Sequence, residues 1–144
     1  MKSEKKDIII VGGGLAGLTY AIHLLKSGFD VTLIEKNHYP QHKVCGEYIS
    51  NEVLPYLKWL DVDPAQLNPT EITRLSISSA SGKTVNTELP LGGFGISRFA
   101  LDHFLYEKAL QNGCTFINDT VTAIDFKDDI FSISTAKTGL LNAK

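Results

Sequence analysis

The chain has 144 residues, a formal net charge of −2, and a composition of 43% hydrophobic and 21% charged residues. This length fits one ordinary domain, and the composition is typical of a soluble globular protein. The slightly negative charge argues against a basic face for nucleic acid. No apolar run approaches the roughly 18 residues of a transmembrane helix, and no signal peptide is evident, so we expect a cytoplasmic protein without a membrane span.

A glycine-rich turn follows the first predicted strand. The apolar run at 8–11 predicts a buried parallel strand, and it leads directly into Gly12, Gly14 and Gly17, spaced G-x-G-x-x-G. In this pattern the first glycine permits a tight turn, the second lets a diphosphate approach the backbone, and the third lets the following helix pack close to the sheet. The N-terminus of that helix offers unpaired N–H groups and a partial positive charge to phosphates.

A helix and a second strand complete this unit. Apolar residues recur at helical spacing from Leu15 to Leu25, and Ser27-Gly28 ends the helix. The second strand, 31–34, is followed by Glu35, an acid about 20 residues after the glycines. A carboxylate at this distance hydrogen-bonds the hydroxyls of a ribose and repels a 2′-phosphate. The context of two strands, a helix and an acid favours a dinucleotide site over a glycine-rich turn without a ligand.

A polar loop and a short helix come next. The loop spans 36–43, and Cys45-Gly46-Glu47 leads from it to Ser50, the expected N-cap of a helix over 51–60. Because Pro55 lies one turn in, we expect this helix to start or to kink there. We expect Cys45 either as a small buried residue or beside a cofactor ring. Together with Cys114 it is expected to be a free thiol, and no histidine is spaced to form a metal site with the two cysteines.

Residues 66–95 break the alternation of strand and helix. Strict alternation over 71–78 predicts a strand with one exposed face, and Ser81-Gly82 predicts a turn into a return strand over 84–89. We therefore interpret 66–95 as an inserted β-hairpin segment. The glycines around Phe94 predict either a close backbone approach or a flexible corner.

The last third of the chain contains one long helix and several strands. Ser97 is the expected N-cap of a helix from Arg98 to Gln111, and Asn112-Gly113 ends it. Arg98 is either an exposed first-turn residue or a ligand contact, and the second is favoured because a cation there opposes the helix dipole. Strands are expected over 114–117, 121–126 and 130–134, with another strand-like stretch from Leu140.

Four stretches of the chain, taken in order, resemble the N-terminal part of an FAD-dependent oxidoreductase. The family is the one that contains the geranylgeranyl reductases and the hydroxybenzoate-hydroxylase-like monooxygenases. The matching stretches are Asp7–Glu35, Lys43–Ser50, Ile96–Asp102 and Asp119–Ile124. The loop from Cys45 to Glu47 is more similar to the geranylgeranyl-reductase and halogenase-like branches than to the aromatic hydroxylases, which commonly have Arg near the position of Lys43. The resemblance implies an α/β fold, a Rossmann-like βαβ FAD-binding domain with an inserted antiparallel β segment, truncated at its C-terminus.

The resemblance also implies the cofactor contacts. The residues that would line the FAD diphosphate are Gly12, Gly14, Leu15, Ala16 and Gly17. Glu35 and Lys36 would meet the adenosine ribose, Arg98 would reach the cofactor from the start of its helix, and the backbone at Val121 would touch adenine. The remaining residues assigned to the cofactor site are Lys43, Cys45 and Gly46. No side chain is a convincing general acid or base, so we assign no catalytic residue and no metal ligand.

Members of this family are more than twice as long and carry a later Gly-Asp motif and a substrate domain, to whose sheet 66–95 would belong. We therefore expect residues 1–144 to be the N-terminal portion of a longer flavoprotein, binding the adenine half of FAD weakly and with little or no turnover alone. The reaction of the whole protein would be reduction of an isoprenoid-type double bond, or monooxygenation or halogenation, with NADPH as an optional external reductant.

The substrate would be a small molecule, either polar or apolar. The sequence does not predict the oligomeric state. Two alternatives remain: an NAD-binding Rossmann module without flavin chemistry, and a non-catalytic interaction fragment. The inserted hairpin at 71–89 and the Cys45 loop argue against the plain Rossmann module, because such a module alternates strands and helices.

Overall fold

The computed structural model describes residues 5, 6 and 8–143, and the chain divides into two compact units. The first unit combines Met1–Gln41 with Asp102–Lys144, and the second is His42–Leu101. Asp7, which begins the first matching stretch, lies outside the described residues.

A three-stranded parallel sheet forms the centre of the first unit. Its order is β2 (Ile8–Val11), β3 (Val31–Glu35) and β7 (Thr115–Asn118), and α1 (Leu15–Lys26) connects β2 to β3. Every residue of β3 is buried, as expected for a parallel strand that is covered on both faces. The predicted βαβ unit is confirmed, and the carboxyl ends of all three strands meet at one edge of the sheet.

The buried face of α1 agrees with the predicted apolar stripe in its middle and differs at its ends. Leu18, Ala21 and Ile22 are fully buried, and Leu24 joins them. The predicted core residues Leu15 and Leu25 are only partly buried. The helix ends as predicted, because Gly28 adopts φ +89°, in the left-handed region that glycine tolerates.

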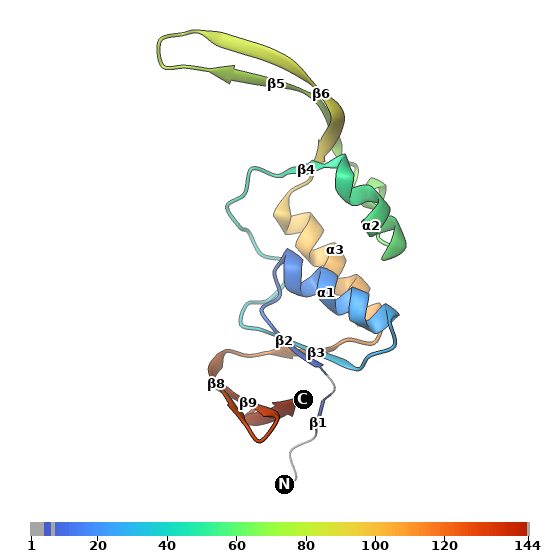
Figure 1. The fold of residues 1–144 in the computed structure, drawn as a ribbon, viewed down its shortest axis with the longest axis vertical. Helices are drawn as coiled ribbons and strands as arrows, with labels where there is room; N and C mark the ends of the chain where they lie inside the picture. Colours follow the sequence, from blue (N-terminus) through green and yellow to red (C-terminus); the bar gives the residue numbers. More distant parts are fainter. Residues whose placement is uncertain (1–4, 7, 144) are drawn as a thin grey trace. The chain divides into compact units, whose positions relative to one another are not determined.

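A second sheet covers the other face of the parallel sheet (Figure 1). Its order is β1 (Lys5–Lys6), β10 (Leu140–Ala143), β9 (Ile130–Thr135) and β8 (Val121–Lys127). Ile133 and Ala143 pack against Ile34 of the parallel sheet and form a buried cluster. Figure 1 shows α1 and the strands β8 and β9 on opposite sides of β2 and β3. The strands predicted in the last third of the chain are therefore confirmed.

Helix α3 (Arg98–Gln111) has the predicted bounds and the predicted cap. The backbone N–H of Ala100 donates to Ser97 Oγ at 3.2 Å. Leu101, Leu105 and Ala109 are buried, whereas Phe104 is half-buried and Leu110 is 41% exposed.

The second unit contains an antiparallel sheet and short helical turns. The sheet order is β4 (Tyr48–Ser50), β6 (Thr84–Gly95) and β5 (Thr70–Ser78). The helix expected over 51–60 is divided into a 3₁₀ turn, η1 (Asn51–Val53), and α2 (Leu54–Trp59), followed by η2 (Pro64–Leu67). Pro55 lies in the first turn of α2, so the expected break at this proline is confirmed. Ser50 caps η1 by accepting a hydrogen bond from the backbone N–H of Glu52 at 3.4 Å.

Strand β6 corrects two expectations. It runs through the glycines around Phe94 instead of ending at 89, and it pairs with β4, a strand that the sequence did not predict. A Cβ on Gly93 would lie under 3.0 Å from the ring of Tyr48, so the close backbone approach at these glycines is to a tyrosine of the same unit. The alternative prediction of a flexible corner at these glycines is therefore wrong.

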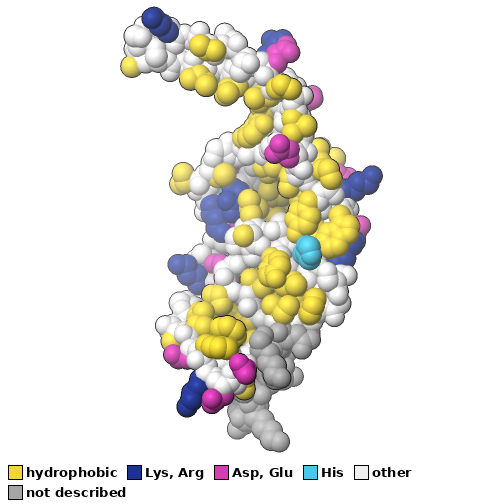
Figure 2. Space-filling model, in the orientation of Figure 1, with side chains coloured by type: hydrophobic (Ala, Val, Ile, Leu, Met, Phe, Trp, Pro, Cys, Tyr) yellow, Lys and Arg dark blue, Asp and Glu magenta, His cyan; other side chains and the backbone are white. Residues whose placement is uncertain are grey.

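Residues 73–88, the outer part of the hairpin of β5 and β6, are exposed on both faces. The expectation of one buried face was wrong, because Ile77 and Val85 are directly paired across the strands and are 60% and 66% exposed. Leu75 is also 42% exposed, and Figure 2 shows apolar side chains along the hairpin, at the top of the view. That the segment belongs to a substrate-domain sheet stays a prediction.

Among the described residues, no helix has both the length and the apolar character needed to cross a bilayer. The cytoplasmic location stays a prediction.

Candidate nucleotide site

A cavity of about 250 Å³ opens at the carboxyl ends of β2 and β3. Its lining residues are Val11, Gly12, Ile34, Glu35, Lys36, Asp119, Thr120 and Val121. Four of them are predicted cofactor contacts, Gly12, Glu35, Lys36 and Val121, and they come from three different segments of the chain. Ligands of open α/β sheets bind at this edge, outside the carboxyl ends of the strands.

The turn between β2 and α1 has the geometry that the glycine spacing predicts. Gly12 adopts φ +103°, a conformation that residues with a side chain rarely adopt. A Cβ on Gly17 would lie under 3.0 Å from the carbonyl oxygen of Gly12, so only glycine lets α1 approach the turn this closely. The predicted roles of the first and third glycines are therefore confirmed.

The N-terminus of α1 is available to an anion. Gly14 is the N-cap, and among the described residues no side chain caps the helix and no acid lies in its first turn. The first N–H groups of a helix have no partner within it, and the helix dipole gives this end a partial positive charge. Leu15 is half-buried and Ala16 is exposed in this first turn. The geometry fits a phosphate group.

Glu35 is held by two backbone amides. Its Oε2 accepts from the N–H of Gly13 at 2.7 Å, and its Oε1 accepts from the N–H of Asn37 at 2.9 Å. The residue is only 7% exposed. An ionised carboxylate has about four lone-pair sites, so each oxygen keeps the capacity to accept a ribose hydroxyl. The predicted acid therefore lies at the cavity, and its orientation is fixed by the glycine turn itself.

Asp119 forms one wall of the cavity and was not predicted as a site residue. Desolvation would raise the pKa of its carboxyl, but N–H donors from Thr138, Thr120 and Lys137 and the Thr138 hydroxyl outweigh it and hold the pKa well below its usual range. The three N–H bonds measure 2.7, 2.7 and 3.0 Å. A carboxylate so fully engaged is a poor proton acceptor, so Asp119 holds the β7–β8 loop against the β9–β10 turn and is no general base.

Tyr39 is the second residue that sequence reasoning missed. Its hydroxyl donates to the carbonyl oxygen of Gly13, and its ring stacks on Tyr106 with centroids 4.4 Å apart. Burial, followed by the charges of Glu35 and Asp102, raises the pKa of Tyr39 far above its ordinary value. The loop 36–43 was predicted only as polar, and no periodic pattern in it singles out one anchored aromatic residue.

The remaining predicted site residues lie in the second unit. They are Lys43, Cys45, Gly46 and Arg98, and their cofactor contacts stay predictions. Cys45 is exposed, so its alternative role as a small buried residue is wrong, while Cys114 is buried. Both cysteines are free thiols, as predicted. Within the described residues, no three His, Cys, Asp or Glu side chains lie together as a metal site.

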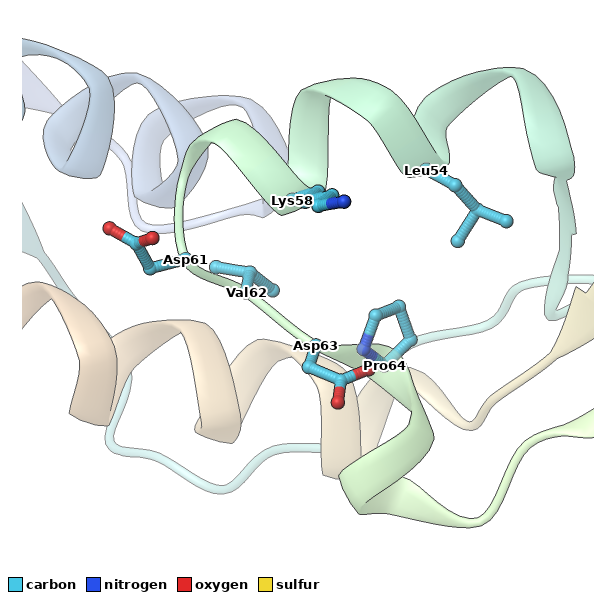
Figure 3. A pocket seen from close by; sticks show the side chains of 6 residues that line it. All are labelled: Leu54, Lys58, Asp61, Val62, Asp63 and Pro64. Carbon is cyan, nitrogen blue, oxygen red and sulfur yellow. The ribbon is translucent and has the colours of Figure 1, made fainter.

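A cavity of about 480 Å³ in the second unit lacks convergent polar groups (Figure 3). Leu54, Val62 and Pro64 form its apolar lining. Asp63 accepts the N–H of Ala65 at 3.0 Å as the N-cap of η2. In Figure 3 the carboxylates of Asp61 and Asp63 point away from Leu54. This cavity therefore presents no arrangement for acid–base chemistry, and the crevice beside β2 and β3 is the better candidate.

A glycine turn, an uncapped helix N-terminus and a fixed carboxylate at one sheet edge define a dinucleotide-binding domain. The chain belongs to the family of FAD-dependent oxidoreductases (DAO), whose model matches residues 7–80. FAD is the cofactor of this family.

Curated relatives cover most of the chain. It is 30% identical over 139 residues to digeranylgeranylglycerophospholipid reductase 1 of Methanothermobacter thermautotrophicus, a match that covers 89% of this chain and 34% of the relative. It is 25% identical over 135 residues to the flavin-dependent halogenase otaD of Aspergillus carbonarius, covering 88% of this chain and 27% of the relative. The chain thus spans between about a quarter and a third of the length of these relatives.

The fold is shared with a solved flavoprotein. The structure of halogenase PltM in complex with phloroglucinol and FAD matches with a TM-score of 0.79 and 21% identity, covering 96% of this chain and 33% of that one. At this identity the match establishes the fold alone.

Proposed function

We propose that this chain binds the adenosine diphosphate part of FAD, as the cofactor-binding portion of a flavin-dependent oxidoreductase. One observation carries the proposal: Gly12 and Glu35 line one cavity beside β2 and β3, and the Glu35 carboxylate accepts from the N–H of Gly13, next to the uncapped N-terminus of α1. The N–H groups of the first turn of α1 would hold the diphosphate, and Glu35 would accept from the ribose hydroxyls. The backbone at Val121, which lines the same cavity, would contact adenine.

FAD, when bound, supplies the redox chemistry, and this part of the protein supplies binding and orientation. For the whole protein we propose either reduction of an isoprenoid-type double bond or a monooxygenase or halogenase reaction, with NADPH as the external reductant. Similarity to a phospholipid reductase and to a halogenase supports these two reaction classes. The substrate is a small molecule, and the reductase reaction would take an apolar one.

The test is a calorimetric titration of the chain with ADP, FAD and NAD. ADP and FAD are expected to bind, and Glu35→Ala should weaken both by about 1–3 kcal/mol, the scale for losing hydrogen bonds to a charged group. Gly14→Val should abolish binding because a side chain would occupy the space of the phosphate oxygens. Asp125→Ala, which removes an exposed acid of β8, is the matched control and should leave all affinities unchanged.

Two results would contradict the proposal. If Glu35→Ala and Gly14→Val both bind ADP like the unmodified chain, the nucleotide site lies elsewhere. If NAD binds and ADP and FAD do not, the chain is a nicotinamide-cofactor module instead of a flavin one.

A further inference from the structure

Both polar groups of Gly13 are held by side chains. The N–H of Gly13 donates to Glu35 Oε2 at 2.7 Å, and its carbonyl oxygen accepts from the hydroxyl of Tyr39. The G-x-G-x-x-G pattern leaves position 13 free, so the pattern does not account for this arrangement. The middle residue of the turn is therefore fixed from two sides by residues that lie 22 and 26 positions further along the chain.

We propose that Tyr39 is a positioning residue for the cofactor diphosphate, fixing the Gly13–Gly14 peptide so that the N–H of Gly14 faces the phosphates. The inference rests on the proposed function above. In a planar trans peptide the C=O and the following N–H point in opposite directions. A bond from Tyr39 to the Gly13 carbonyl therefore directs the Gly14 N–H away from the tyrosine. Gly14 is the N-cap of α1, so this N–H lies at the positive end of the helix.

The structure supplies a reason for glycine at position 13. A Cβ there would lie under 3.0 Å from the hydroxyl oxygen of Tyr39 and 3.0 Å from Cβ of Glu35. Any side chain at this position would push one of these two residues off the turn. A third consecutive glycine is thus required by the approach of Tyr39 and Glu35, in addition to the glycines that the turn and the helix require.

The ring of Tyr39 is anchored to regular structure. It stacks on Tyr106 of α3 at 4.4 Å, with an interplanar angle of 17°, and it lies 5.9 Å from the ring of Phe116 on β7. Tyr106 also meets Phe116 edge-on at 4.8 Å. These ring contacts orient Tyr39 and so direct its hydroxyl towards Gly13.

The hydroxyl remains a donor throughout the physiological range. Burial, and after it the charge of Glu35, raises the pKa of Tyr39, so the proton stays on the oxygen that donates to Gly13. A hydrogen bond on the carbonyl side of a peptide polarises the N–H on the other side, which strengthens its bond to an anion. Both effects act on the phosphate contact and leave the ribose and adenine contacts unchanged.

The experiment compares ADP with adenosine, which lacks the phosphates, by protein-observed NMR titration of the chain and of Tyr39→Phe. The variant keeps the ring stacked on Tyr106 and removes only the hydroxyl. Its affinity for ADP should fall about 3- to 10-fold, the effect of one net hydrogen bond. Its affinity for adenosine should stay within about twofold, because no phosphate contact is involved. Tyr20→Phe, at a 53% exposed position of α1, is the matched control and should change neither affinity.

The outcomes separate the inference from the proposed function. If Glu35→Ala weakens ADP binding but Tyr39→Phe does not, the proposed function stands and the role of Tyr39 is overturned. Equal losses for ADP and adenosine in Tyr39→Phe would also overturn it, because they indicate a merely structural role. If the unmodified chain does not bind ADP, the proposed function and the role of Tyr39 are both overturned.

A second measurement covers the case in which Tyr39→Phe does not fold. In the unmodified chain labelled with ¹⁵N-glycine, the Gly14 amide resonance should shift on addition of ADP and stay in place with adenosine. A Gly14 amide that does not respond to ADP overturns the inference without any variant.

Discussion

Replacing Gly17 with alanine tests the packing of α1 against the glycine turn. Helix propensity alone predicts that this change stabilises the protein, by up to about 1 kcal/mol. The structure predicts the opposite sign. The added Cβ would lie under 3.0 Å from the carbonyl oxygen of Gly12, 3.1 Å from its carbonyl carbon and 3.4 Å from Cγ2 of Ile10. Two of these atoms belong to the backbone of a residue at φ +103°, so they cannot turn aside as a flexible side chain would.

The expected cost follows from this contact. Overpacking of a close-packed interior costs about 1–3 kcal/mol, and a clash with backbone places Gly17→Ala at the upper end. After the gain in helix propensity, the net loss in the free energy of unfolding is about 2 kcal/mol. For a chain of this size the melting temperature should fall by roughly 5–10 °C.

Urea denaturation followed by circular dichroism measures the loss. Ala16→Gly is the matched control, since it lies one residue earlier in α1 at an exposed position and changes propensity without a clash. It should lose only about 0.5–1 kcal/mol. If Gly17→Ala is as stable as the unmodified chain, or more stable, α1 does not approach the turn as closely as described.

Four further predictions rest on single contacts. Under native conditions at pH 8, a thiol reagent should label the exposed Cys45 and not Cys114, because burial raises the pKa of the Cys114 thiol to about 11, and both should react in denaturant. The pKa of Asp119 is lower in the folded chain than its ordinary value of 3.8, so the ionised carboxylate stabilises the fold fully above pH 3.8. This stabilisation is lost as the pH falls towards the pKa of the folded state. Asp119→Asn should therefore flatten the loss of stability measured between about pH 4 and pH 2. Gly13→Ala should destabilise the chain in thermal melts, and Tyr39→Phe in the same protein should recover part of the loss, because it removes the atom nearest to the new Cβ. Incubated with FAD, NADPH and oxygen, the chain should show no turnover of NADPH above the rate of free flavin, since it spans about a third of the reductase it resembles.

The elements of the first unit could be predicted because each carries its own local signal. The strand at 8–11, the helix after it and the strand at 31–34 are apolar runs or stripes, and the structure places all three as expected, with Glu35 added to the second strand. The second unit was less predictable. Residues 71–78 alternate as a strand with one buried face does, yet Leu75 and Ile77 are exposed. Alternation shows which residues share a face, but it does not show whether another layer covers that face.

The candidate site divides in the same way between local and distant contacts. Gly12, Gly17 and Glu35 could be predicted, since their roles depend on a fixed spacing within one βαβ unit. Tyr39 could not, because its role depends on a stack with Tyr106, 67 positions later, and no pairing of this range is visible in one sequence. The signal that could have pointed to it was the extra glycine at position 13. A glycine that neither the turn nor the helix requires indicates that another group needs its space, and the nearest group in the structure is the hydroxyl of Tyr39.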